Sequence, residues 1–522
     1  MRILFGLPLL IVFSALGPAA PQLRASTLWG NLTPGPHSVG YKTVFTYDLS
    51  RSPLIVDRDN KEIVPMPRGR QMQFGVWYPA RHDGRRSFLR YEHYVHLLAQ
   101  ELQFSPLSLR EREENVQAFM KEPLSLGAAA DKLKALMRLK TAAIKDARPA
   151  RGRFPLVIFA HVAPALNSIM CEYLASHGFV VAAIPVKGSF EHALDVGLTG
   201  VETQIRDIEF VMGVLKKEPN VAGDKIAAIG MSFGAISVLG FATRNSEVDA
   251  LVSLDGGIGS PFGAGVVQRT PFYSLFRVAA PLLHLYGPSV PGTDLTFINR
   301  LKYSRRYLLA FPALRHTDFV NYGMLEYFVP NIQGKPSGDT KTGFEWVCRY
   351  TLRFLNAYLK VDRESRLLLD SLAKANSGRE AILIADIKEN VQPPPTVQQL
   401  RALIEEKGVG SVVALYKELT NADPQPFTQQ SLSDIARWLG EKGDWKSTRE
   451  IVDLRLSSYP ESAWANYAAA EVYRRVGDIE RSRKLYNEAL RLLPTDFEPE
   501  TDIRRRAIYE GARRNVQSPN NR

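Results

Sequence analysis

The 522-residue chain has little cysteine and no long apolar segment beyond its N-terminus. Cys171 and Cys348 are too few for a disulfide framework or a four-thiolate zinc site. After residue 26 no uncharged apolar stretch approaches ~20 residues, so we expect no membrane-spanning helix in the mature chain. The 66 basic and 54 acidic residues give a net charge of +12, but no lysine- or arginine-rich run resembles a nucleic-acid-binding tail. We therefore expect neither a metal or other cofactor nor a nucleic-acid partner.

The first 26 residues have the layout of a secretory signal. Met1-Arg2 is a short basic start, residues 3–16 are apolar, and Gly17-Pro18-Ala19-Ala20 follows. The run is too short to span a membrane, and no cysteine follows it as a lipid-anchor site. We expect a secreted or periplasmic protein; a buried N-terminal strand is the alternative. Cleavage near Ser26 would leave a charge of 64 − 54 = +10.

Before residue 154 the pattern changes from strands to helices. Residues 39–47 and 72–78 are strand-like, and the stretch 80–153 has a helical pattern, with Leu133, Leu136, Met137 and Ile144 on one side. We interpret residues 80–153 as a helical insertion. It holds 15 basic and 9 acidic residues, which suits either a solvated insertion or a lid that attracts anionic or interfacial substrates and makes peripheral membrane contact.

From residue 154 short β-branched runs alternate with helical segments. Near-continuous apolar strands between helices indicate a doubly wound, mostly parallel sheet covered on both faces. We therefore predict an α/β domain over residues 27–365. The expected strands are 156–160, 180–184, 226–229, 250–254, 281–286 and 307–311, and the expected helices are 169–177, 201–217, 233–242 and 344–359.

The C-terminal part has a repeat. Gly443-Asp444 and Gly477-Asp478 are 34 residues apart, as are Pro460 and Pro494. This period resembles tetratricopeptide repeats, whose stacked helix pairs form concave surfaces for proteins or peptides. We expect an all-α repeat domain at 398–515, with a degenerate unit at 403–424. A linker at 366–397, marked by Pro393-Pro394-Pro395, should precede it; an unrelated helical tail is the alternative.

One pentapeptide suggests nucleophilic chemistry. Gly230-Met231-Ser232-Phe233-Gly234 follows the strand expected at 226–229 and opens a helix. In a G-x-S-x-G turn the glycines let the backbone pass, and the serine is held strained and exposed. The helix N-terminus behind it favours developing negative charge. We predict that Ser232 is a nucleophile; a packing turn is the alternative.

A serine nucleophile needs a base and an acid that orients the base. His316 follows the last expected strand, at the sheet edge where doubly wound folds bind ligands, and gives the chain order Ser, acid, His. A surface histidine is the alternative, and His284, inside an apolar run, is expected in the core. Asp255 and Asp294 each follow a strand, so either could orient the imidazole or serve as a turn aspartate.

An oxyanion hole needs two backbone N–H groups. Phe233, directly after the nucleophile, is expected to supply one. Ala163, in the loop after the strand at 156–160, is the candidate for the other, because Pro164 has no N–H. We expect His161 to hold this loop rather than to catalyse.

Over residues 30–360 the chain resembles platelet-activating-factor acetylhydrolase-like esterases, a branch of the α/β-hydrolase superfamily close to dienelactone hydrolases. This resemblance implies an α/β-hydrolase fold, Asp255 as the acid with Asp294 as runner-up, and metal-free hydrolysis of short-acyl or oxidised-acyl esters. Besides residues 230–234, it is carried by Gly35-Pro36-His37-Ser38-Val39-Gly40, Trp77-Tyr78-Pro79-Ala80, Phe154-Pro155-Leu156-Val157-Ile158-Phe159, Leu174-Ala175-Ser176-His177-Gly178-Phe179-Val180-Val181 and His316-Thr317-Asp318-Phe319.

The chain departs from that family at His161-Val162, where the family usually has His-Gly. Valine does not share the positive φ angles open to glycine, so the second oxyanion donor is expected to be arranged differently. The main hypothesis is a serine esterase that cleaves small or lipid-like esters through Ser232, His316, Asp255 and an acyl-enzyme. The rivals are a hydrolase-fold scaffold with a weakened site, whose repeats hold a protein, and a serine peptidase.

Overall fold

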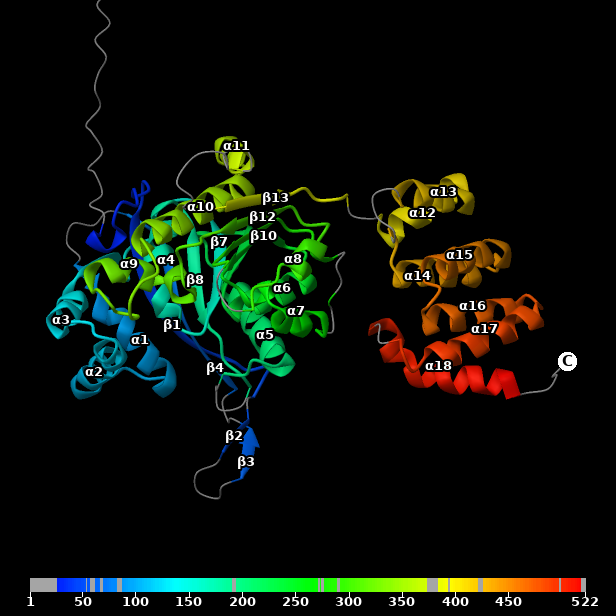
Figure 1. Ribbon diagram of the computed structural model, residues 1–522, viewed down its shortest axis with the longest axis horizontal. Helices are drawn as coiled ribbons and strands as arrows, with labels where there is room; N and C mark the ends of the chain where they lie inside the picture. Colours follow the sequence, from blue (N-terminus) through cyan, green and yellow to red (C-terminus); the bar gives the residue numbers. More distant parts are fainter. Residues whose placement is uncertain are drawn as a thin grey trace, which may run out of the picture. The chain divides into compact units, whose positions relative to one another are not determined.

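The computed structural model describes most of the chain after residue 25. The described residues are 26–52, 54–56, 62–65, 69–81, 87–189, 194–270, 273, 277–288, 292–372, 384–392, 395–420, 426–496 and 499–517. The expected signal up to residue 25, Pro393-Pro394 of the expected linker and residues 421–424 of the degenerate repeat lie outside them. Strands and helices alternate up to β13, and only helices follow among the described residues (Figure 1).

The described strands form an eleven-stranded sheet and a separate antiparallel pair, β2–β3. The order in the large sheet is β13-β12-β11-β10-β9-β7-β8-β4-β1-β6-β5. Pairing is parallel for β7–β8, β10–β11, β11–β12 and β1–β6, and antiparallel for β1–β4, β4–β8, β5–β6 and β12–β13. The strands are β1 Ser38–Asp48, β2 Leu54–Val56, β3 Ile63–Pro65, β4 Arg70–Ala80, β5 Phe88–Arg90, β6 Lys140–Lys145, β7 Phe154–His161, β8 Val180–Pro185, β9 Val221–Met231, β10 Val248–Leu254, β11 Leu282–Tyr286, β12 Arg306–Ala310 and β13 Ile384–Lys388.

Helices connect and follow these strands. The α-helices are α1 Tyr91–Gln103, α2 Leu109–Ser125, α3 Ala130–Arg138, α4 Ser168–Ser176, α5 Leu198–Leu215, α6 Gly234–Arg244, α7 Pro261–Gln268, α8 Thr296–Arg300, α9 Asn321–Phe328, α10 Thr340–Leu359, α11 Arg363–Ser371, α12 Val397–Lys407, α13 Val409–Leu419, α14 Gln429–Glu441, α15 Trp445–Ser458, α16 Ala463–Arg475, α17 Ile479–Leu492 and α18 Pro499–Gln517. Short 3₁₀ turns are η1 Thr27–Trp29, η2 Pro164–Asn167, η3 Gly257–Gly259 and η5 His316–Phe319.

The prediction of an α/β fold with a mostly parallel sheet is confirmed. Each strand expected between residues 154 and 311 is present, from β7 to β12. All of β8 is buried, and so is β7 after its first residue. Burial along whole strands is what a sheet covered on both faces requires, and it explains their continuous apolar runs.

Two compact units divide the chain. The first contains the described residues up to Val186 together with Phe210–Ala227 and Pro312–Ser365, and the second contains Lys187–Glu209, Ala228–Phe311 and the described residues from Arg366 onward. In the first unit, the buried Glu172 of α4 joins three segments: its carboxylate accepts hydrogen bonds from Trp29 Nε1 (3.1 Å), Tyr94 OH (2.6 Å) and Ala142 N (3.0 Å). Burial raises the pKa of this carboxyl group.

The stretch 80–153 is only partly helical. It contains α1, α2 and α3, but α3 ends at Arg138 and Leu139 is extended, so the expectation of a helix that includes Ile144 is wrong. Ile144 lies in β6, which pairs with β1 and is anchored through Ala142 to Glu172. Backbone pairing with a distant strand and with a buried carboxylate therefore outweighs the local helical pattern.

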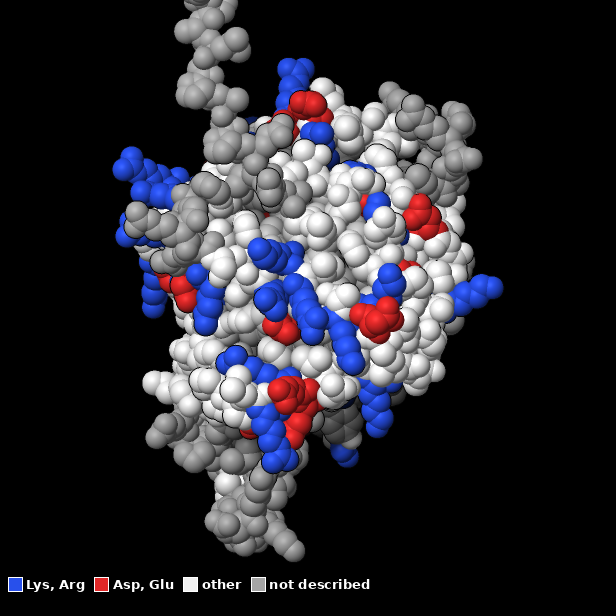
Figure 2. Space-filling model, turned by 90° about the vertical axis from the view of Figure 1, so that its left-hand side faces the viewer, with Lys and Arg blue, Asp and Glu red and all other residues white. Residues whose placement is uncertain are grey.

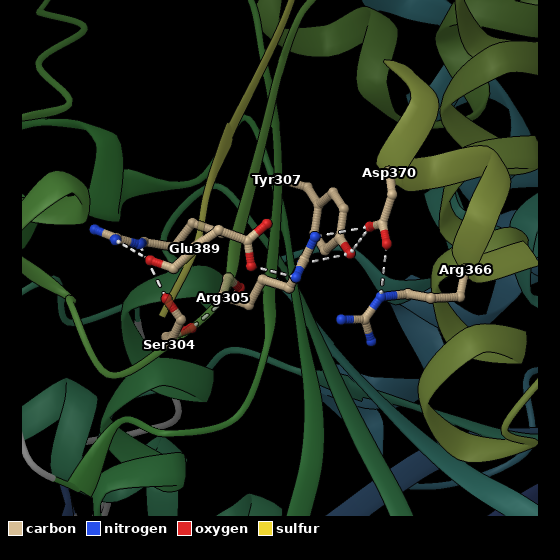
Figure 3. Close-up of polar contacts among 7 residues, drawn as sticks. Ser304, Arg305, Tyr307, Arg366, Asp370 and Glu389 are labelled. Atoms are coloured by element: carbon tan, nitrogen blue, oxygen red, sulfur yellow. Dashed lines mark hydrogen bonds and ion pairs between the residues drawn. The ribbon is translucent and has the colours of Figure 1, made fainter. Parts of the chain in front are cut away.

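The segment expected as a linker, 366–397, also contains regular structure. It includes the end of α11 and all of β13, which pairs antiparallel with β12. Figure 3 shows the polar cluster that joins these elements: Arg305 forms ion pairs with Glu389 after β13 and with Asp370 of α11 (3.0 Å). Tyr307 of β12 donates a hydrogen bond to the same Asp370 at 2.7 Å. The chain thus adds an edge strand to the sheet before the C-terminal helices begin.

The C-terminal part is helical, and its two Gly-Asp turns have the same geometry. Gly443 and Gly477 have φ of 76° and 86°, and each following aspartate caps the next helix. Asp444 accepts from Ser447 N at 3.0 Å, and Asp478 accepts from Arg481 N at 3.1 Å. The helix pair expected at 403–424 starts earlier than predicted, because α12 begins at Val397.

The first unit has a basic face. Figure 2 shows many Lys and Arg side chains and fewer Asp and Glu side chains on the face of Figure 1 where α1 to α3 lie. Lys132, Lys134 and Arg138 of α3 are exposed. None of the helices in the described part of the chain has the length and apolar character to cross a bilayer.

Candidate active site

Ser232 lies in a strained turn between β9 and α6. Its φ is +55°, the left-handed region that residues with a side chain rarely adopt. The turn is closed by its own backbone, because Ser232 O accepts hydrogen bonds from Ala235 N (3.1 Å) and Gly257 N (2.8 Å). The side chain of Ser232 is half-buried, so it remains accessible. A strained conformation held by several backbone bonds is typical of functional sites.

Gly230 makes this turn sterically possible. A Cβ atom at residue 230 would lie 2.5 Å from the carbonyl carbon of Gly234 and closer still to the backbone of Ala235. The start of α6 can therefore pack against the end of β9 only because residue 230 has no side chain. Phe233 is the N-cap residue of α6, so its N–H is at the open end of the helix.

The residues on either side of Asp255 are hydrogen-bonded to the turn that carries Ser232. Ser232 N donates a hydrogen bond to Leu254 O at 3.2 Å, and Gly257 N donates a second hydrogen bond to Ser232 O. Asp255 is also left-handed (φ +39°) and nearly buried (9% exposed). Its Oδ1 accepts a hydrogen bond from Gly287 N at 2.9 Å, after β11. The β10 end, the β11 end and the serine turn thus form one connected group in the second unit.

Asp294 has a different role in the structure. Its carboxylate accepts a hydrogen bond from Thr296 N at 2.8 Å, the contact of a turn aspartate at the start of α8. Hydrogen bonds from the side chain and from the backbone N–H of Thr296 lower the pKa of Asp294, which is half-buried. Asp294 N donates to Gly259 O at 2.7 Å, so its loop lies next to η3. The carboxylate of Asp294 therefore forms its hydrogen bond within its own loop.

The first unit contains the other candidate residues. His161 ends β7, and its Nδ1 lies 3.0 Å from Ala163 O and 2.8 Å from Asn167 Nδ2. These are contacts of a histidine that holds the following loop. Burial, with a smaller contribution from the charge of His316, lowers the pKa of His161 to about 4, although the hydrogen bond with Ala163 O acts in the opposite direction. Val162 is 40% exposed at the tip of this loop.

His316 begins the 3₁₀ turn η5, and its side chain is half-buried. The helix that follows, α9, is joined to the start of α4 through Asn321. Asn321 Oδ1 accepts from Ile169 N at 3.1 Å, and its Nδ2 donates to Ser168 Oγ at 2.9 Å. The structure thus brings His316, His161 and Ala163 into one region of the first unit, and Ser232, Phe233 and Asp255 into one region of the second.

Several residues around these groups were not found by the sequence analysis. Asn167 and Asn321 act through contacts distant in sequence, and no local pattern identifies them. Arg315 and Asp318, on either side of His316, form an ion pair at 2.9 Å. Opposite charges three residues apart in the sequence could have predicted this pair. His284 is in the core, as expected; its Nδ1 lies 2.9 Å from Ser253 Oγ, and burial lowers its pKa to about 4.

Within the described ranges, no group of three His, Cys, Asp or Glu side chains has the arrangement of a metal site. Both cysteines are buried, and burial raises their pKa values.

Solved structures include proteins similar to this chain. The chain is similar to a ferulic acid esterase from Streptomyces cinnamoneus, with a TM-score of 0.45 and 19% identity over 66% of this chain and 96% of that chain. No family model matches the sequence, and no curated protein matches it.

Proposed function

We propose that the chain is a serine hydrolase of the α/β-hydrolase superfamily that cleaves short-acyl carboxylic esters. The observation that carries the proposal is the left-handed Ser232 on the β9–α6 turn, with Gly230 beneath it. Such a turn presents the hydroxyl at the end of a strand and in front of a helix N-terminus, where negative charge is favoured. The strand order from β1 to β12 and the resemblance of residues 30–360 to acetylhydrolase-like esterases support this assignment.

The proposed mechanism has two steps. His316 takes the proton from Ser232 Oγ as the oxygen attacks the ester carbonyl, and the N–H groups of Phe233 and Ala163 bind the oxyanion. The alcohol leaves with the proton from His316, and an acyl-enzyme remains. Water, deprotonated by His316, then releases the carboxylic acid and restores Ser232.

Asp255 is the proposed acid that orients His316. It is nearly buried, and the residues on either side of it are hydrogen-bonded to the serine turn, whereas the carboxylate of Asp294 is used in its own turn. A buried carboxylate stabilises an imidazolium more than an exposed one does, because water screens it less. These contacts favour Asp255.

We also infer roles for the rest of the chain. The matching Gly-Asp turns and their 34-residue period favour tetratricopeptide-like repeats that bind a protein or peptide. The basic face over α3 suits anionic substrates or a peripheral membrane contact. The pattern of residues 1–26 favours export.

Covalent labelling tests the proposal. A fluorophosphonate probe should label the full chain at one serine, and Ser232→Ala should abolish both labelling and hydrolysis of p-nitrophenyl esters. Ser237→Ala is the matched control: Ser237 is fully buried in α6, the helix that follows Ser232, and its hydroxyl has no hydrogen-bond partner among the described residues. That variant should label like the parent.

The outcomes separate the rival functions. Labelling lost only in Ser232→Ala supports the hydrolase, and a panel of esters and peptides then separates an esterase from a peptidase. A parent chain that neither labels nor hydrolyses any ester refutes the proposal and favours the scaffold hypothesis.

A further inference from the structure

The backbone on both sides of His316 is held by one ion pair. Arg315 Nε and Nη2 donate to the two carboxylate oxygens of Asp318 at 3.0 and 2.9 Å. Arg315 N also donates to Asp318 Oδ2 at 2.8 Å. A bidentate pair with an added backbone bond fixes orientation as well as distance. We call this pair the Arg315–Asp318 clamp.

The clamp is attached to a second segment of the same unit. Arg315 Nη1 donates to Gln333 O at 2.9 Å and to Lys335 O at 3.0 Å, beyond α9. Asp318 is fully buried and the Arg315 side chain is 24% exposed, so solvent screens the pair less than it would a surface pair. The guanidinium thus connects the His316 turn to the segment that follows α9.

The turn itself offers little rigidity. It is a single 3₁₀ turn of four residues, and hydrogen bonds in such turns have poor geometry. Leu314 and Phe319 are buried and anchor its two ends. The ion pair is formed by Arg315 and Asp318, and the side chain of His316 between them is half-buried.

We propose that Arg315 and Asp318 are positioning residues that hold His316 where it can accept the proton of Ser232. The inference rests on the proposed function, since only a catalytic base needs this precision. The clamp limits movement of the backbone at residue 316, so the imidazole can move only by rotation about its own side-chain bonds. A displacement of about 1 Å at a catalytic group can cost about 100-fold in rate.

The test measures kcat and KM for p-nitrophenyl acetate with the full chain. Asp318→Asn keeps the size of the side chain but removes its charge, and we expect kcat to fall by about 10- to 100-fold with KM changed less than about twofold. Arg315→Lys keeps the charge but cannot form the two parallel hydrogen bonds to the carboxylate, so it should also lower kcat with little change in KM. This variant provides the test if Asp318→Asn does not fold.

The matched control is Glu345→Gln, which also removes a buried carboxylate of the first unit. Glu345 is 2% exposed and pairs with Lys341 (2.9 Å) and Arg349 (3.3 Å) on α10. It should lower the unfolding midpoint without lowering kcat. A general loss of stability would lower kcat in Glu345→Gln as well as in the clamp variants, whereas loss of positioning lowers kcat only in the clamp variants.

The outcomes distinguish the two proposals. If the parent hydrolyses the ester through Ser232 and Asp318→Asn keeps its kcat, the clamp proposal alone is overturned. An equal loss of kcat in Glu345→Gln also overturns it. If the parent neither labels nor turns over, the proposed function fails and the clamp proposal fails with it.

Discussion

A methyl group added at Gly230 should damage both the fold and the nucleophile. The Cβ atom in Gly230→Ala would lie 2.5 Å from the carbonyl carbon of Gly234, where ordinary contacts begin at 3.4 Å. Relief therefore requires a movement of at least 3.4 − 2.5 = 0.9 Å, because backbone atoms of Ala235 lie closer still. The atoms in the way are backbone, so no side-chain rotation can provide it. Helix α6 is buried from Gly234 to Thr243 and has little room to move.

The expected cost follows from this geometry. Overpacking a core costs about 1–3 kcal/mol when side chains can adjust, and we expect at least the upper value here. A shift of nearly 1 Å in the serine turn should also slow acylation by about 100-fold. Gly213→Ala is the control: an added Cβ at this exposed position of α5 meets no atom within 4 Å. It should stabilise the chain by about 0.5–1 kcal/mol.

Urea denaturation and the rate of fluorophosphonate labelling measure the two effects. Gly230→Ala should unfold at lower urea than the parent and label more slowly even where it is fully folded. The reasoning would be refuted by a Gly230→Ala variant that matches the parent in both assays, because the β9–α6 turn would then have room for a side chain.

Two further predictions concern the acid and the buried histidines. Asp255→Asn should lower kcat by about 10⁴-fold, while Asp294→Asn should stay within about twofold of the parent; the reverse ranking, measured with p-nitrophenyl acetate, would reassign the acid. Burial lowers the pKa values of His161 and His284 to about 4 from 6.5. As pH falls below 6.5, the unfolded chain therefore takes up protons before the folded chain does. Each histidine contributes up to about 3 kcal/mol to the free energy of unfolding, and this contribution is present above pH 6.5 and lost as pH falls towards 4. In urea titrations, His284→Gln should reduce the slope of stability against pH between these limits, and an unchanged slope would contradict this assignment.

The sheet could be predicted where single strands are buried along their whole length. The apolar runs of β7 and β8 are continuous because both faces are covered, and such runs are visible in the sequence. The residues of β6 and β13 are different. Their patterns are short and partly exposed, and they become strands by pairing with β1 and β12. Partners so far away in sequence, such as Val39 for Ala143 and Ala310 for Ile384, leave no local signal.

The candidate site divides in the same way. Ser232 could be predicted because a single turn, with glycine on each side, determines its conformation. The choice between Asp255 and Asp294 could not be made from the residues alone, since both follow strands and both suit turns. The difference lies in their contacts, namely Gly287 N for Asp255 and Thr296 N for Asp294.

The position of His316 depends on elements that lie outside its own motif. Asp318 is part of the motif, but its partner Arg315 precedes it, and the carbonyls that hold Arg315 come from Gln333 and Lys335. A motif search scores each residue separately and does not register that these groups form one hydrogen-bonded unit. The placement of the proposed base thus depends on the Arg315–Asp318 pair, to which we assign no chemical step, so substitutions there should change rate before they change binding.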